Sequence, residues 1–351
     1  MPTAVYEIDP IRDSRWEEFL GGHPKASVFH TAPWLEALRR TYDYVPIALT
    51  TSPPGERLQN GIVFCKIRSW LTGRRLVSLP FSDHCELLWN TPAEAKNLLR
   101  YSQTALHREN WNYAEIRSRD PNFGNLTEGV EFLPVGSYFL HEVDLRPASN
   151  EIFGGFHKSS VQRRIQHAER AGLREAFGNE EELLRDFYLL FVRTRHRHNL
   201  PPQPLDWFRN LRECIGEKLT IRVAYMGVTP VASILTLRFK DIVYYKYAAS
   251  DAQFHNLGAS PWLLWRAITE ARESGATRLD LGRSEETHAG LVKFKSHWTG
   301  QATRLTYWRC VSSSRTIAED QRTMSLAKRV CAHMPEGLLT LVGELLYKHV
   351  G

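Results

Sequence analysis

The chain has 351 residues, of which 42% are hydrophobic and 24% are charged, and it carries a formal net charge of +6 with a pI near 9.0. This composition is that of a soluble globular protein, and the length suffices for two domains of ordinary size. The basic balance favours a polyanionic partner such as RNA, nucleotide phosphates or an anionic membrane surface, although +6 over this length is also only mildly basic.

The sequence argues against several classes of protein. The five cysteines are scattered without any C-x-x-C, which argues against a disulfide framework and a zinc site. No apolar run approaches the roughly 20 residues of a bilayer-spanning helix. The N-terminus lacks the basic-then-apolar pattern of a signal peptide. We therefore expect a cytoplasmic protein without a metal site.

The first half of the chain predicts a mixture of helices and strands. Thr31 and Pro33 mark the start of a helix with an apolar stripe that includes Trp34 and Leu38. A polar segment dense in ionisable groups, residues 80–89, follows the third predicted strand. The expected strands are 47–49, 61–67, 76–79 and 113–116, and a second helix is expected at 94–108.

The second half opens with a basic helix near residues 159–172, which includes Arg163 and Arg164. A second helix, 180–197, ends in the basic run Arg193–His198, whose two histidines at i, i+2 diverge and form no metal site. Three strands are then expected at 219–225, 231–239 and 242–249.

The stretch 242–284 predicts a strand, a polar loop, a capped helix and a strand. Ser260 is placed as the helix N-cap with Pro261 at the first helical position, and Gly275 ends the helix. Leu264 and Ile268 give the helix an apolar face. The loop therefore meets the positive end of a helix, where anions are favoured.

The two halves resemble each other. The helix and strand around residues 98–118 align with those around residues 263–284, and several strands precede each copy. We predict an α/β fold with mixed sheets, built from two tandem duplicated domains at residues 1–148 and 149–312. Residues 313–351 are predicted to be a tail with an amphipathic helix that packs on protein or lies on anionic lipid.

The loop after the strand 242–249 resembles the cofactor loop of the GNAT acyltransferase fold. There the pattern Gln/Arg-x-x-Gly-x-Gly/Ala cradles the pyrophosphate of acyl-CoA. Here Gln253, Asn256 and Gly258 occupy the three defined positions, with Asn256 in place of the first glycine. The resemblance implies that this loop binds the donor's phosphates, and Asn256 adds a side chain where a phosphate would approach.

Five segments in the same order resemble the FemAB-like branch of the GNAT superfamily. They are Ser27–Trp34, Ser78–Glu86, Ser159–Leu173, Leu279–Ser284 and Val292–Gly300. The resemblance implies tandem GNAT domains that transfer an acyl group to an amine. It implies acyl-CoA or aminoacyl-tRNA as co-substrate, with no tightly bound cofactor, and a phosphate-bearing or lipid-linked acceptor. The long coiled-coil arm of some Fem-type enzymes is not seen in this sequence.

Amide formation needs a base for the amine and stabilisation of an oxyanion. Asp83, His84 and Glu86 form the densest ionisable cluster outside a predicted helix, so Asp83 and His84 are candidate catalytic residues, against the alternative of a salt-bridged loop. Lys295 matches the lysine of the family's Phe-Lys motif and is the third candidate. On a strand, Lys293 and Lys295 would share one face.

Further residues are candidates for binding the donor or substrate. Arg283 ends a strand beside Gly282, and Tyr245 and Tyr247 are expected on one strand face that lines the cleft or points away from it. Arg163 and Arg164 would bind phosphates or form the wet side of a helix. The full set of binding candidates is Arg163, Arg164, Tyr247, Gln253, Asn256, Gly258, Arg283 and Lys293.

Three functions follow from these observations. The first is an acyltransferase or aminoacyltransferase acting on an amine in cell-envelope or exopolysaccharide biosynthesis, with tRNA as one partner and a membrane contact through the C-terminal helix. The second is a non-catalytic GNAT-like adaptor that binds a nucleotide-sugar or lipid-linked glycan. The third is an RNA-binding module, supported by the basic helices alone.

Overall fold

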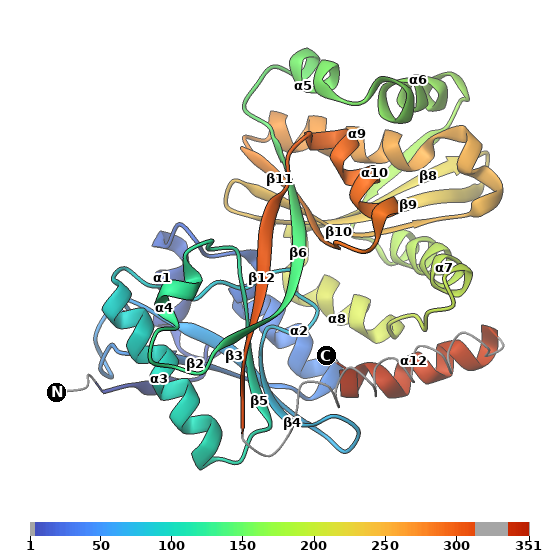
Figure 1. The fold of residues 1–351 in the computed structure, drawn as a ribbon. Coiled ribbons are helices and arrows are strands. Elements are labelled where there is room, and N and C mark those ends of the chain that lie inside the picture. The colour runs from blue at the N-terminus through green and yellow to red at the C-terminus, as the bar shows by residue number, and fades with distance from the viewer. Residues whose placement is uncertain (1–3, 313–335, 351) are drawn as a thin grey trace. The chain divides into compact units, whose positions relative to one another are not determined.

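The computed structural model describes residues 4–312 and 336–350, which divide into two compact units. Among these residues, unit 1 comprises 4–138, 304–312 and 344–350, and unit 2 comprises 139–303 and 336–343. Strand β6 (Leu133–Asp144) carries the chain from unit 1 into unit 2, and β12 (Thr303–Val311) carries it back (Figure 1).

Unit 1 holds a mixed sheet with the strand order β1-β2-β3-β4-β5-β12. Neighbouring strands are antiparallel except β4 and β5, which are parallel. Its elements are β1 (Tyr6–Ile8), α1 (Ser14–Gly22), η1 (Val28–His30), α2 (Ala32–Tyr42), β2 (Val45–Thr50), β3 (Ile62–Ser69), β4 (Gly73–Ser78), α3 (Pro92–Arg108), β5 (Tyr113–Ser118) and α4 (Phe123–Leu126).

Unit 2 repeats this plan with the strand order β7-β8-β9-β10-β11-β6. Strands β7 to β10 are antiparallel neighbours, and β10 pairs with β11 in parallel. Its elements are α5 (Ser149–Gly155), η2 (Lys158–Gln162), α6 (Arg163–Arg170), β7 (Arg174–Gly178), α7 (Glu181–Arg197), α8 (Leu205–Ile215), η3 (Gly216–Lys218), β8 (Leu219–Met226), β9 (Thr229–Phe239), β10 (Ile242–Ser250), η4 (Ala252–Leu257), α9 (Ala259–Glu273), β11 (Arg278–Glu285) and α10 (Ala289–Thr299).

The repeated plan confirms the predicted duplication of an α/β domain. In each unit three antiparallel strands lead into a crossover helix and then into a strand parallel to the third. The crossover is α3 between β4 and β5, and α9 between β10 and β11. A helix between parallel strands is the usual way to make that connection, since the chain must return to the same end of the sheet.

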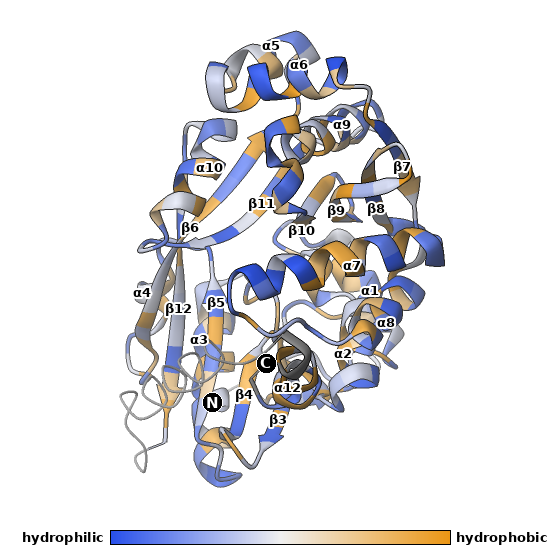
Figure 2. Ribbon diagram, turned by 90° about the vertical axis from the view of Figure 1, so that its right-hand side faces the viewer, coloured by the Kyte–Doolittle hydropathy of each residue, from blue (hydrophilic) through white to orange (hydrophobic). Residues whose placement is uncertain are grey.

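Each sheet buries its crossover helix in an apolar core. In unit 1 the core includes Leu98 and Leu106 of α3, and in unit 2 it includes Leu264 and Ile268 of α9. The latter two are the apolar face that the sequence predicts, and they are fully buried. Figure 2 shows hydrophobic stretches on strands and on helices alike, with hydrophilic residues at one end of α7. Both units therefore have the cores that stable domains require.

The C-terminal helix is α12 (Glu336–Val350). Leu339 is buried, whereas Leu341 and Leu345 are exposed. Residues 313–335 of the predicted tail lie outside the described residues. In the described part of the chain, no helix combines the length and hydropathy needed to cross a bilayer.

Candidate functional site

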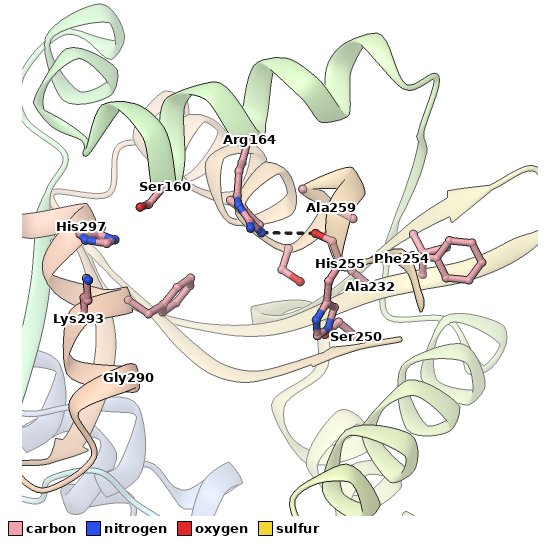
Figure 3. A pocket seen from close by; sticks show the side chains of 15 residues that line it. Ser160, Arg164, Ala232, Ser250, Phe254, His255, Ala259, Gly290, Lys293 and His297 are labelled. Atoms are coloured by element: carbon pink, nitrogen blue, oxygen red, sulfur yellow. Dashed lines mark hydrogen bonds between the residues drawn. The ribbon is translucent and has the colours of Figure 1, made fainter. Parts of the chain in front are cut away.

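Unit 2 contains a pocket with a volume of about 420 Å³ between α6, α9 and α10 (Figure 3). The last residue of β10, Ser250, and the following helix η4 close one side. The residues that line it are Ser160, Arg164, Val231, Ala232, Ser250, Phe254, His255, Gly258, Ala259, Ser260, Pro261, Gly290, Lys293, Phe294 and His297.

The charged lining of the pocket is entirely basic. Arg164, His255, Lys293 and His297 contribute cationic or potentially cationic groups, and none of the described residues places a carboxylate in the lining. Figure 3 shows Arg164 descending from α6, with Lys293 and His297 of α10 on one side and His255 on the other. The Arg164 guanidinium donates a hydrogen bond to the His255 carbonyl oxygen at 3.4 Å. Such a cavity favours an anionic group.

The start of α9 adds to this preference. The helix begins at Ala259 with Gly258 as N-cap, so the expected N-cap at Ser260 is wrong, and Ser260 and Pro261 lie inside the first turn. The first N–H groups of a helix have no intrahelical acceptor and carry the positive end of its dipole. No acidic residue occupies that turn. A phosphate in the pocket would meet these backbone donors.

Gly258 is required here by geometry. Its φ is +76°, in the left-handed region that suits glycine. A Cβ at this position would lie 2.4 Å from the carbonyl oxygen of Arg164. The absence of a side chain thus lets α6 pack onto the start of α9, which brings Arg164 to the pocket.

The other two positions of the predicted loop motif do not line the pocket. Gln253 and Asn256 belong to η4 and are exposed, while Phe254 and His255 between them line the cavity. The basic end of α7 holds this loop, because Arg193 pairs with Asp251 at 2.8 Å and Arg197 donates to the Ser250 carbonyl at 2.9 Å. The position of His255 two residues after the motif residue Gln253 is the signal that would have identified it.

Two histidines that sequence reasoning did not place in the donor site have lowered pKa values. Burial, with help from Arg197 and Arg164, lowers the pKa of His255. Burial, His157 and Lys293 lower the pKa of His297. The rings of His157 and His297 stack with centroids 4.2 Å apart. Neutral imidazoles are therefore favoured, and they act as hydrogen-bonding groups rather than as fixed charges.

Lys293 and Lys295 lie on helix α10, so the expected strand at this position is wrong. Residues two apart on a helix point in different directions. Lys293 lines the pocket, whereas the Lys295 ammonium is buried and donates to the carbonyl oxygens of Gly282 at 2.9 Å and Arg283 at 2.8 Å.

Lys295 thereby fixes a kink in β11. Gly282 has a φ of +70°, and its N–H donates to the buried Asp280 carboxylate at 2.6 Å. The parallel pairing of β10 and β11 ends at Tyr244 and Asp280, although both strands continue. The Asp280 and Lys295 side chains together hold the β11 backbone where the two strands part.

Tyr245 and Tyr247 do not share a face as expected from strand periodicity. The pairing of β10 with β9 shifts register between them, so a β-bulge interrupts the alternation. Tyr245 packs against the core beneath α9. Tyr247 accepts a hydrogen bond from the Trp207 indole at 2.9 Å and contacts aromatic rings of α7 and α8. Tyr247 is thus part of the core on the α7 side.

Two predicted arginines lie outside the pocket lining. Arg163 is exposed on α6, one residue before Arg164. Arg283 is half-buried in β11, directly after the kink at Gly282. On α6 the sequence could not decide which of two adjacent arginines faces the cavity.

The candidate bases Asp83 and His84 belong to unit 1. His84 is buried against the edge of the Phe29 ring, and Asp83 is half-buried. The Asp83 carbonyl accepts a hydrogen bond from the Tyr307 hydroxyl at 2.9 Å. Glu86 accepts from the Ser118 hydroxyl at 2.9 Å and is therefore a structural carboxylate.

The loop that carries these bases is rigidly held. Arg117 donates to the carbonyl oxygens of Leu79 at 2.6 Å and Ser82 at 2.8 Å. In the described part of the chain, no group of three or more His, Cys, Asp or Glu side chains is arranged to hold a metal ion.

Part of unit 2 matches a known protein family. Residues 155–296 match the family model of the acetyltransferase (GNAT) domain, and this range contains every lining residue of the pocket except His297. No curated protein sequence matches the chain.

Solved structures extend the similarity to both units. FemX is 12% identical with a TM-score of 0.69, over 92% of this chain and 100% of its own. A tandem GNAT protein from the clavulanic acid biosynthesis pathway is 8% identical with a TM-score of 0.57, over 89% of this chain and 100% of its own. L-PGS from Bacillus licheniformis is 15% identical with a TM-score of 0.50, over 79% of this chain and 87% of its own. The chain therefore has a duplicated GNAT-like fold, and its similarity to FemX confirms the resemblance to the FemAB-like branch at the level of the fold.

Proposed function

We propose that the protein transfers an acyl or aminoacyl group from a phosphate-bearing donor to an amine. The observation that carries this proposal is the all-basic pocket at the N-terminus of α9, inside the GNAT domain. Arg164 and Lys293 supply charge to the donor's phosphates, and the first backbone N–H groups of α9 supply directed donors.

The reaction is a direct transfer. The amine nitrogen attacks the carbonyl carbon of the donor, the bond to the donor's sulfur or oxygen breaks, and an amide forms. The amine loses a proton to a base, and the leaving thiolate or alkoxide is protonated. We propose Asp83 as the base, because its half-buried side chain is more accessible than the buried ring of His84.

The donor class is either an acyl-CoA or an aminoacyl-tRNA. The tandem GNAT structure was solved without AcCoA, a name that favours an acyl-CoA donor, while the resemblance of the sequence to the FemAB-like branch favours an aminoacyl-tRNA. We place the reaction in the cytoplasm, with a phosphate-bearing or lipid-linked acceptor in cell-envelope or exopolysaccharide synthesis.

A binding and transfer experiment tests this proposal. Thermal unfolding is followed with acetyl-CoA, with an aminoacyl-tRNA and with a UDP-linked precursor, since a ligand of the folded state raises the unfolding temperature. The double variant Arg164→Ala, Lys293→Ala serves as the control, because it removes both permanent positive charges from the pocket. We expect one donor to stabilise the wild-type chain and not the variant. Mass spectrometry then detects the amide, which Asp83→Asn should abolish.

The rival function is a non-catalytic adaptor. Asn256 in place of a glycine of the phosphate loop favours it, because the family pattern for acyl-CoA is incomplete. An adaptor would bind the UDP-linked precursor and yield no amide with either donor. Stabilisation by a donor together with amide formation would exclude this function.

A further inference from the structure

An apolar projection stands on the surface of unit 1. Trp70, at the turn between β3 and β4, is 82% exposed, and Leu345 on α12 is 64% exposed. A large aromatic ring this exposed is uncommon in a soluble protein, because its burial would release considerable free energy. We call Trp70, Leu71, Leu345 and the flanking residues Arg68 and Lys348 the Trp70 patch.

The parts of the Trp70 patch are tied into one surface. The Trp70 indole donates to the His349 ring at 3.0 Å, and the two rings contact edge to face. The His349 carbonyl accepts hydrogen bonds from the Thr72 hydroxyl and from Arg75, both at 2.7 Å. Leu345 lies one helical turn before His349, on the same side of α12. The indole therefore contacts α12 one helical turn after the exposed Leu345.

Basic residues flank Trp70 in the sequence, whereas the exposed Glu344 precedes Leu345 on α12. Residues 66–75 contain Lys66, Arg68, Arg74 and Arg75 and no acidic residue. Arg68 is exposed and forms no ion pair with any residue in the described part of the chain, so its charge is available to a partner. Lys348 pairs with the exposed Asp43, and Lys66 pairs with Glu7. The turn between β3 and β4 thus exposes the Trp70 ring near the unpaired charge of Arg68.

We propose that the Trp70 patch docks onto an anionic lipid surface. An indole ring prefers the boundary between lipid headgroups and acyl chains, where its ring is buried and its surroundings stay polar. Leucine on an amphipathic helix adds buried apolar area, and each nearby Arg or Lys adds attraction to anionic headgroups. A second copy of the chain is the weaker occupant, because it would bring like charges together.

Flotation of the full chain with lipid vesicles tests the proposal. Phosphatidylcholine vesicles with and without phosphatidylglycerol are used, with Trp70→Asp and Leu345→Asp as patch variants and Arg68→Glu as the charge variant. Val228→Asp is the matched control, since Val228 is 92% exposed on a turn of unit 2. We expect the wild-type chain to bind only to vesicles that contain phosphatidylglycerol. In each patch variant the affinity for these vesicles should fall by at least about tenfold. The control should bind as the wild type does.

Three results would overturn the proposal. They are no binding to phosphatidylglycerol vesicles, equal binding by wild type and Trp70→Asp, or a dimer in sedimentation velocity that Trp70→Asp dissolves. Circular dichroism verifies that each variant is folded. Acyl transfer to a soluble amine should be unchanged in Trp70→Asp, so failure of the docking proposal can be told apart from failure of the proposed function.

Discussion

The carbonyl oxygen of Arg164 lies in the space that a side chain at position 258 would occupy, 2.4 Å from the place of its Cβ. This approach joins helix α6 to the start of α9 and brings the Arg164 guanidinium to the pocket. The stability of unit 2 and the charge of its pocket therefore depend on the same glycine.

Replacing Gly258 by alanine should destabilise the protein. A methyl group adds overlap with the Arg164 carbonyl and is strained at a φ of +76°, which together cost about 2 to 4 kcal/mol. Urea unfolding measures the change. Gly290→Ala is the control, because Gly290 also lines the pocket but has open space around it. Equal stability of the two variants would contradict the role given to Gly258.

Arg164 and Arg163 are neighbours with different predicted roles. Arg164→Ala should raise the KM for the donor roughly tenfold, the effect of losing one charge-assisted hydrogen bond to a phosphate. Arg163→Ala should leave the KM nearly unchanged, since this side chain does not line the pocket. Steady-state kinetics at two salt concentrations provide the measurement, and the loss should shrink at high salt. Similar KM values for the two variants would argue against the pocket as donor site.

Lys293 and Lys295 should also give opposite results when each is changed to methionine. Lys293→Met should raise the donor KM without altering stability, because its ammonium lines the pocket. Lys295→Met leaves the carbonyls of Gly282 and Arg283 without their buried donor, which costs about 3 kcal/mol. It should also lower kcat, since the β11 kink is released. Urea unfolding and kinetics on both variants test this contrast, which a normal stability of Lys295→Met would refute.

Stability should fall as the pH drops from 7.5 to 5, partly through His30. Burial lowers the pKa of His30 to about 4, from an ordinary value of 6.5. Between these values the unfolded chain binds a proton that the folded chain does not, so the stabilisation present above pH 6.5 is lost on acidification. For this single group the loss at pH 5 is about 2 kcal/mol.

His30→Gln isolates this contribution. Its free energy of unfolding should depend less on pH than that of the wild type, although it is lower at pH 7.5 because contacts with Ser27 and the Glu86 carbonyl are lost. His107→Gln, at an exposed position of α3, should keep the wild-type pH dependence. A pH profile unaltered by His30→Gln would show that other groups control acid unfolding.

The sequence was sufficient for the two crossover helices α3 and α9 and for the duplication. The apolar periodicity of Leu264 and Ile268 placed α9 correctly, because that pattern records burial along the whole helix. The short segment around Lys295 was misassigned as a strand, since alternation over five residues cannot be told from the first turns of a helix. A hydrophobic pattern distinguishes helix from strand poorly when it covers only one or two helical turns.

The errors at the site have a common physical origin. The bulge in β10 places Tyr245 and Tyr247 on different faces of the strand. No residue type in that strand predicts a bulge. The choice between Arg163 and Arg164 depends on where α6 touches α9, a contact made at Gly258. Both features arise from tertiary packing, which acts between residues distant in sequence. Hydrophobic periodicity and helix caps depend on neighbouring residues, so they do not predict this packing.

The passage of β12 back into unit 1 has a consequence for synthesis on the ribosome. Residues 306–311 pair with the whole of β5, yet they are translated after all of unit 2 up to residue 303. Unit 2 can therefore complete its sheet while β5 still has an open edge. During synthesis the N-terminal part of a chain usually folds first. Here we expect unit 2 to fold first, because unit 1 cannot complete its sheet until β12 has been made. A nascent chain stalled before residue 304 would then have a protease-resistant second unit beside a first unit that is still cleavable.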